Sequence, residues 1–228
     1  MLYKHKKRFI LKRILLIVVI TLSPFQNLPA QSKYDKSFYG GLFYLSEFIA
    51  SGEFESFKKN NDDLAQVDLI YQKAINFYDG DFSESLLALT FTCLPFDHIK
   101  VKFLFGSQIN IPLPSPPKII FKQKVANLPS RLFFDTPNTN FGDKDKLAHF
   151  FGNAFLRYNF GFFNLSKFMG IFVENVEEGL FIEGGYSPRD IIANHLGELF
   201  AESLKCNKDI LPSDILKIYQ LLFFRIKI

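Results

Sequence analysis

Ionisable and amide side chains recur at helical spacing in a C-terminal segment that is otherwise strongly apolar. Asp145, His149 and Asn153 are four residues apart, so a helix would place them on one face. The Asp145 carboxylate could accept a hydrogen bond from one imidazole nitrogen of His149 and leave the other nitrogen for a partner, a ligand or a metal. The alternative is a helix-capping aspartate beside a solvated histidine, because such pairs also arise by chance.

A second polar group lies on the segment 165–182, for which the sequence also predicts a helix. Glu174, Glu177 and Glu178 occupy one arc of this helix, between two apolar faces. Carboxylates that are buried close together acquire raised pKa values and can share protons or bind a cation. The alternative is a solvated acidic face with no binding role.

A third predicted helix has the clearest start in the sequence. Ser187 suits the N-cap and Pro188 suits the first helical position. Asp190 stands where a capping-box acid belongs, and it shares a face with Asn194 and Gly197. Small residues on that face would let a neighbouring helix approach closely, which brings Asp190 and Asn194 within reach of the first helix.

These polar stripes predict one site between the first and third helices. His149 should come within hydrogen-bond reach of Asp190, Asn194 or a glutamate of the second helix. His195 points about 100° away from Asn194 and is secondary. The candidate site residues, all of them polar and on predicted helices, are Asp145, Lys146, His149, Glu174, Glu178, Asp190 and Asn194.

The elements that must position this site predict a mainly α fold. Alternation of apolar and polar residues over 98–105 and 108–113 predicts a β-hairpin, and a proline-rich loop follows it. Cys93 and Cys206 are the two cysteines, and their pairing stays open. The predicted parts are a signal peptide at 1–30, a helical region at 31–95, the hairpin and proline-rich connector at 96–141, the three-helix module at 142–205 and a tail helix at 206–228.

The N-terminus predicts export. Six basic residues, namely Lys4, Lys6, Lys7, Arg8, Lys12 and Arg13, precede an uncharged apolar run of nine residues, Ile14 to Leu22. A spanning helix needs about 20 residues, so this length is typical of a signal-peptide core. Leu28-Pro29-Ala30 is a candidate cleavage site, and an uncleaved anchor is the alternative. Without residues 1–30 the chain has 21 Lys and Arg against 23 Asp and Glu, a net charge of −2 instead of +4.

The motifs resemble those of VanZ-like proteins and, more closely, of YfiM-type envelope lipoproteins. The similarity covers residues 142–202 and rests on Asp145-Lys146-x-x-His149, the glutamate-bearing second helix and Ser187-x-x-Asp190-x-x-x-Asn194-x-x-Gly197. It implies an α-helical module of the cell envelope, in a family without an established activity. Two features depart from the pattern. No lipid-attachment cysteine follows the predicted signal peptide, and Glu177 and Glu178 stand where the family more often has Asp or Gln.

Two classes of function remain open. In the first, a non-catalytic envelope component, the polar network fixes helix packing or binds a ligand. In the second, a periplasmic hydrolase acting on lipid-linked envelope material, His149 or a glutamate is the general base and a divalent metal could assist. Envelope components or a membrane surface are the expected partners; no basic patch indicates nucleic acid. The sequence has no nucleophile-elbow serine, Gly-rich phosphate loop or zinc-type Cys/His spacing, so the cofactor is left open.

Overall fold

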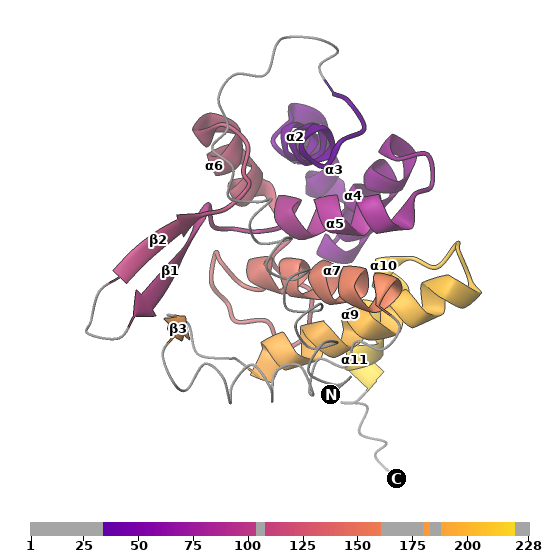
Figure 1. Cartoon of the computed structure of the whole chain (residues 1–228). Coiled ribbons are helices and arrows are strands. Elements are labelled where there is room, and N and C mark those ends of the chain that lie inside the picture. Colours follow the sequence, from indigo (N-terminus) through magenta and orange to yellow (C-terminus); the bar gives the residue numbers. More distant parts are fainter. Residues whose placement is uncertain (1–33, 104–107, 161–179, 183–187, 222–228) are drawn as a thin grey trace, which may run out of the picture.

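The protein is mainly helical, as predicted, and the computed structural model describes residues 34–103, 108–160, 180–182 and 188–221 (Figure 1). The N-terminal helices are α2 (Phe38–Ile49), α3 (Gly52–Asn60), α4 (Asp63–Phe77) and α5 (Phe82–Thr92). The middle elements are β1 (His98–Phe103), β2 (Gln108–Pro112) and α6 (Lys118–Asn127). The C-terminal elements are α7 (Lys144–Asn159), β3 (Leu180–Ile182), α9 (Pro188–Cys206), α10 (Pro212–Leu216) and α11 (Ile218–Leu221). Helices α2–α5 lie on one side of α7 and α9 in Figure 1, and α5 packs directly against α7.

Side-chain caps set the starts of the N-terminal helices. The Ser51 hydroxyl accepts a hydrogen bond from the Phe54 N–H at 3.2 Å, and the Asp81 carboxylate accepts one from the Glu84 N–H at 3.1 Å. Each cap satisfies a backbone donor that has no partner within its own helix. The helical region that the sequence predicts for residues 31–95 is therefore confirmed over its described part.

The β-hairpin forms as predicted, and a third strand joins it. β1 lies at the centre of the sheet and pairs antiparallel with β2, with Ile99 opposite Ile111. Its other edge pairs antiparallel with β3, where Val101 lies opposite Ile182. The prediction of helix through Ile182 is thus wrong at its C-terminal end. The sequence Leu-Phe-Ile fits either period over so short a run, and the free edge of β1 selects the extended form.

The connector between the hairpin and α7 contains the helix α6, where the sequence predicts only a proline-rich loop. Pro117 occupies the N-cap position, where a missing N–H costs no helical hydrogen bond. Inside α6, the ammonium of the buried Lys124 donates to the carbonyls of Thr92 and Leu94, both at 2.8 Å, at the end of α5. Burial lowers the pKa of Lys124 to about 8. These two contacts fix α6 against the N-terminal helices.

The segment after α9 forms two short helices, α10 and α11, where the sequence predicts one tail helix. Pro212 begins α10, and its position after α9 breaks any continuous helix. The Ser213 N–H donates to the Asp68 carboxylate of α4 at 2.9 Å. The C-terminal part of the described chain is therefore held on an N-terminal helix.

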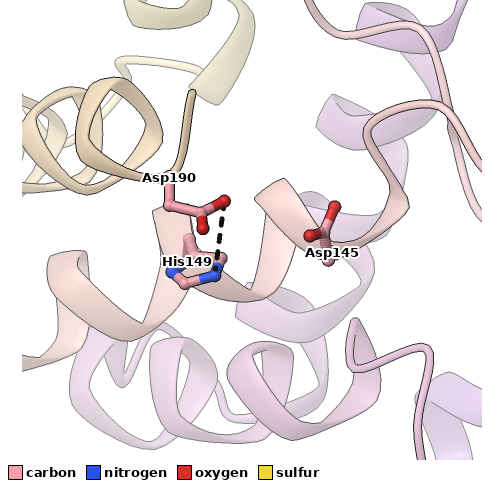
Figure 2. A group of neighbouring side chains, drawn as sticks. All are labelled: Asp145, His149 and Asp190. Carbon is pink, nitrogen blue, oxygen red and sulfur yellow. Dashed lines mark ion pairs between the residues drawn. The ribbon is translucent and has the colours of Figure 1, made fainter. Parts of the chain in front are cut away.

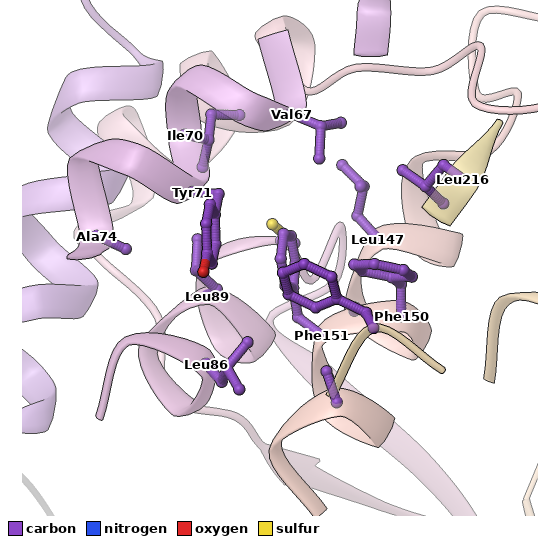
Figure 3. Packing of buried hydrophobic residues seen from close by; sticks show 14 of the residues in the cluster. Val67, Ile70, Tyr71, Ala74, Leu86, Leu89, Leu147, Phe150, Phe151 and Leu216 are labelled. Carbon is purple, nitrogen blue, oxygen red and sulfur yellow. The ribbon is translucent and has the colours of Figure 1, made fainter. Parts of the chain in front are cut away.

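One apolar core joins the two halves of the chain (Figure 3). Phe150 and Phe151 of α7 are fully buried and lie among side chains of α4, α5 and α10. Cys93 is buried and Cys206 is exposed, and both thiols are free. Among the described helices, none combines the length and the apolar character that crossing a membrane requires.

Candidate functional site between α7 and α9

The close approach of α7 and α9 depends on Gly197, as the sequence predicts. A Cβ atom at this position would lie 2.1 Å from the Phe150 carbonyl oxygen and 3.2 Å from the Ala154 nitrogen. Real Cβ atoms do not come so near to backbone, so only glycine permits this crossing. Polar side chains on the facing stripes of the two helices therefore meet directly.

Asn194 contacts the inner side of the His149 ring and is itself held by Asn153. Nδ1 of His149 lies 3.1 Å from Oδ1 of Asn194, and Nδ2 of Asn153 donates to the same oxygen at 2.6 Å. Since a carbonyl oxygen only accepts, the proton of a neutral ring is assigned to Nδ1. Nε2 then carries the lone pair that can act as a base or a ligand.

The outer side of the ring faces a carboxylate (Figure 2). Nε2 of His149 lies 3.7 Å from Oδ1 of Asp190. With the proton on Nδ1, both facing atoms are acceptors, and they repel unless a proton, a water or a cation lies between them. The sequence assigns Asp190 to a capping box, but its carboxylate also reaches across to α7, and the N-cap partner Ser187 lies outside the described residues.

Lys146 bridges the two aspartates of the site. Its ammonium lies 2.6 Å from the Asp145 carboxylate and 2.5 Å from that of Asp190. Burial opposes the charge of Lys146, but the hydrogen bonds and attraction of the two carboxylates outweigh it and raise the pKa of the ammonium. Two negative charges against one positive charge leave the trio at −1, so it attracts one further cation or proton.

The site has a buried inner layer and a more open outer edge. Asn153, Asn194 and Lys146 are buried, whereas the His149 side chain is 33% exposed. Oδ1 of Asp145 is buried and has no hydrogen-bond partner among the described residues. An unsatisfied carboxylate oxygen in such a place is costly, and a bound group would relieve it.

A second ion-pair network, which the sequence analysis missed, supports the start of α9. Asp143 is fully buried and accepts hydrogen bonds from the N–H groups of Leu132 (3.2 Å) and Phe133 (3.3 Å) and from the Thr136 hydroxyl. Its other oxygen lies 2.5 Å from the Arg189 guanidinium. Arg189 directly precedes Asp190 in the chain, so this network fixes the backbone that presents the Asp190 carboxylate.

Gly142 allows the tight backbone turn that places Asp143 in the interior. Its φ of 52° is in the left-handed region, and a Cβ atom would lie 2.1 Å from the Ser130 carbonyl oxygen. The pair Gly142-Asp143 directly before a helix is the one sequence signal for this network. The burial of Asp143, however, depends on the loop 130–136, and no local sequence pattern predicts where that loop lies.

The structure brings together five of the seven candidate residues: Asp145, Lys146, His149, Asp190 and Asn194. Glu174 and Glu178 lie outside the described residues, as does Glu177, so their place relative to this site stays a prediction. His195 is 53% exposed and pairs with Glu198 on the surface of α9. It therefore lies away from the site, as predicted.

Comparisons with protein-family models, curated proteins and solved structures find no match. The geometry of the site therefore carries the functional argument. That geometry offers an oriented imidazole, two carboxylates and a bridging ammonium at the meeting point of two helices. It suits the binding of a small polar or cationic group, and it also contains the parts of a general base.

Proposed function

We propose that this chain is an exported cell-envelope protein in which the α7–α9 site binds a small polar group and helps to fix the packing of the two helices. Export is supported by the basic residues ahead of the short apolar run at 14–22. The resemblance of residues 142–202 to VanZ-like and YfiM-type envelope proteins supports the same location. Envelope components or the membrane surface are the proposed partners.

The observation that carries the binding role is the contrast between the two layers of the site. Asn194, Asn153 and Lys146 are buried and hold the inner layer through direct hydrogen bonds and ion pairs. His149 and Asp145 form the outer edge, where the atoms that could contact a ligand remain. A rigid inner layer that fixes the rotamers of an open outer layer is the arrangement that binding sites require.

Location and binding can be tested on one preparation. Protein isolated from the envelope of its own host should begin near Gln31 by N-terminal sequencing. Retention of Met1 would exclude cleavage, and recovery only from the cytosol would exclude export. Native mass spectrometry of the same sample should show a mass above that of the polypeptide, and the excess should disappear in Asp145→Asn. An excess mass of zero in the wild-type protein would contradict the binding role.

A hydrolase is the second candidate function, and the orientation of His149 favours it. Asn194 holds Nδ1, so Nε2 is available as a general base beside Asp190. Hydrolysis of a radiolabelled polyprenyl diphosphate by the purified protein, lost in His149→Gln and retained in the surface variant His195→Gln, would support this function. Equal activity in the two variants would exclude His149 as the base.

A further inference from the structure

We propose that Asp145, His149 and Asp190 bind one divalent cation of the Zn²⁺ or Mn²⁺ type, in competition with the ammonium of Lys146. The inference rests on the proposed binding function and names the chemistry of the bound group. One imidazole nitrogen and two carboxylate oxygens form a mixed donor set. Imidazole favours Zn²⁺ over Mg²⁺ or Ca²⁺, while carboxylates accept both classes, so the set suits Zn²⁺ or Mn²⁺.

To share one ion, the donors would have to move closer together by up to about 1.4 Å. One ligand atom from each of the three residues lies within 4.8 Å of the other two. In a tetrahedral zinc site with bonds of about 2.1 Å, the ligand atoms are about 3.4 Å apart. The distance of 3.7 Å between Nε2 of His149 and Oδ1 of Asp190 is already close to that value. Three protein ligands would leave one position for water or a substrate atom.

The surroundings of His149 prepare it as a ligand. Metal-binding histidines donate their second ring N–H to a nearby acceptor, which fixes the tautomer and the ring orientation. Oδ1 of Asn194 is that acceptor here, and Asn153 holds the same oxygen from the other side. Since Asn194 is fully buried, this support belongs to the protein interior and does not depend on solvent.

The Asp145 carboxylate gives a second indication of a cation site. Oδ1 of Asp145 is buried without a hydrogen-bond partner among the described residues. The other oxygen of Asp145 contacts Lys146, so the ammonium neutralises the carboxylate from one side only. A cation between Asp145 and His149 would satisfy the orphaned oxygen and separate Nε2 from the Asp190 carboxylate.

The ammonium of Lys146 competes with a divalent cation for the two carboxylates. With the ammonium in place, the trio Asp145, Lys146 and Asp190 has a net charge of −1, and a divalent cation would change it to +1. Either the ammonium moves outward or the cation binds against its repulsion, and both weaken binding. Lys146 therefore limits the affinity that the other three residues would provide.

Isothermal titration of the purified, metal-stripped protein with ZnCl₂ and MnCl₂ tests this inference. His149→Gln and Asp145→Asn should each weaken binding at least tenfold, on the scale that ligand-supporting groups contribute. Lys146→Met should strengthen binding by about tenfold, because it removes the competing charge. The matched control His195→Gln removes a surface histidine of α9 and should leave binding unchanged.

Several results would overturn the inference. These are no measurable binding of either ion to the wild-type protein, equal binding to the wild type and His149→Gln, or loss of binding in His195→Gln. If His149→Gln does not fold, by far-ultraviolet circular dichroism, the Asp145→Asn titration decides. A wild-type protein that binds neither ion but carries another group in native mass spectrometry would refute the cation and leave the proposed function intact.

Discussion

Replacing Asp143 with alanine should destabilise the protein more than any other single removal of a charge in the described structure. The carboxylate is fully buried, and it satisfies two backbone N–H groups of the loop 130–136, the Thr136 hydroxyl and the Arg189 guanidinium. Truncation removes the acceptor of the two buried N–H groups and leaves Arg189 with the more exposed Asp135 carboxylate as its ion-pair partner. Removing one partner of a buried ion pair costs about 3–5 kcal/mol.

Asp135 is the matched control, because it contacts the same arginine from the surface. Nη1 of Arg189 lies 2.6 Å from the Asp135 carboxylate, whose side chain is 36% exposed. An exposed ion pair contributes about 0–1 kcal/mol, so Asp135→Ala should lower the free energy of unfolding by no more than about 1 kcal/mol. Asp143→Asn should fall between the two, since its amide keeps one acceptor oxygen but presents an N–H group to other donors.

Urea unfolding followed by far-ultraviolet circular dichroism measures these differences. Equal m-values, the slopes of the unfolding free energy against urea concentration, would show that the free energies of the variants can be compared directly. The free energies of unfolding of Asp143→Ala and Asp135→Ala should differ by at least about 2 kcal/mol. If the two variants unfold at the same urea concentration, burial does not set the strength of this network.

Four further substitutions and one control test other parts of the structure. Asp190→Ala should lower the free energy of unfolding by about 3 kcal/mol and His149→Ala by about 1 kcal/mol, since both break the α7–α9 network; a His149→Ala protein that is fully stable and abundant but inactive in its host would contradict a structural role. Gly197→Ala should cost about 1–3 kcal/mol by forcing the helices apart, whereas Gly52→Ala, where a Cβ meets nothing within 4 Å, should be nearly neutral in thermal unfolding. The pKa of Lys124 is lowered from 10.5 to about 8, so between these pH values the unfolded state binds more protons than the folded state. As the pH rises through that range, the free energy of unfolding of the wild type should therefore increase by about 3 kcal/mol relative to that of Lys124→Met. Equal pH slopes in the two proteins would show that Lys124 is not buried as a charged group.

Local signals predicted much of the helical framework. Pro188 begins α9, at the first helical position that the sequence assigns to it, and this role follows from neighbouring sequence alone. Gly197 on the polar stripe of α9 correctly predicted the close helix crossing that brings His149 to Asn194. These features depend on spacing along one helix, which the sequence displays directly.

The features that the sequence could not predict depend on distant partners. β3 is a strand because the edge of β1 accepts it, about 80 residues earlier in the chain. Lys124 is buried because the end of α5 offers it two carbonyls, and Asp143 is buried because the loop 130–136 folds over it. A lysine or an aspartate in sequence favours the surface, and only tertiary contacts reverse that preference.

The hydrogen bond between Asp68 of α4 and the N–H of Ser213 joins positions that are 145 residues apart. At synthesis rates of about 5–20 residues per second, the ribosome needs roughly 7–30 s to make the chain between them. During that time α4 has no α10 to cover it, and the place that Leu216 fills in Figure 3 stays open to water. The apolar face of α4 that α10 covers in the folded protein is therefore completed only when nearly all of the described chain has been made.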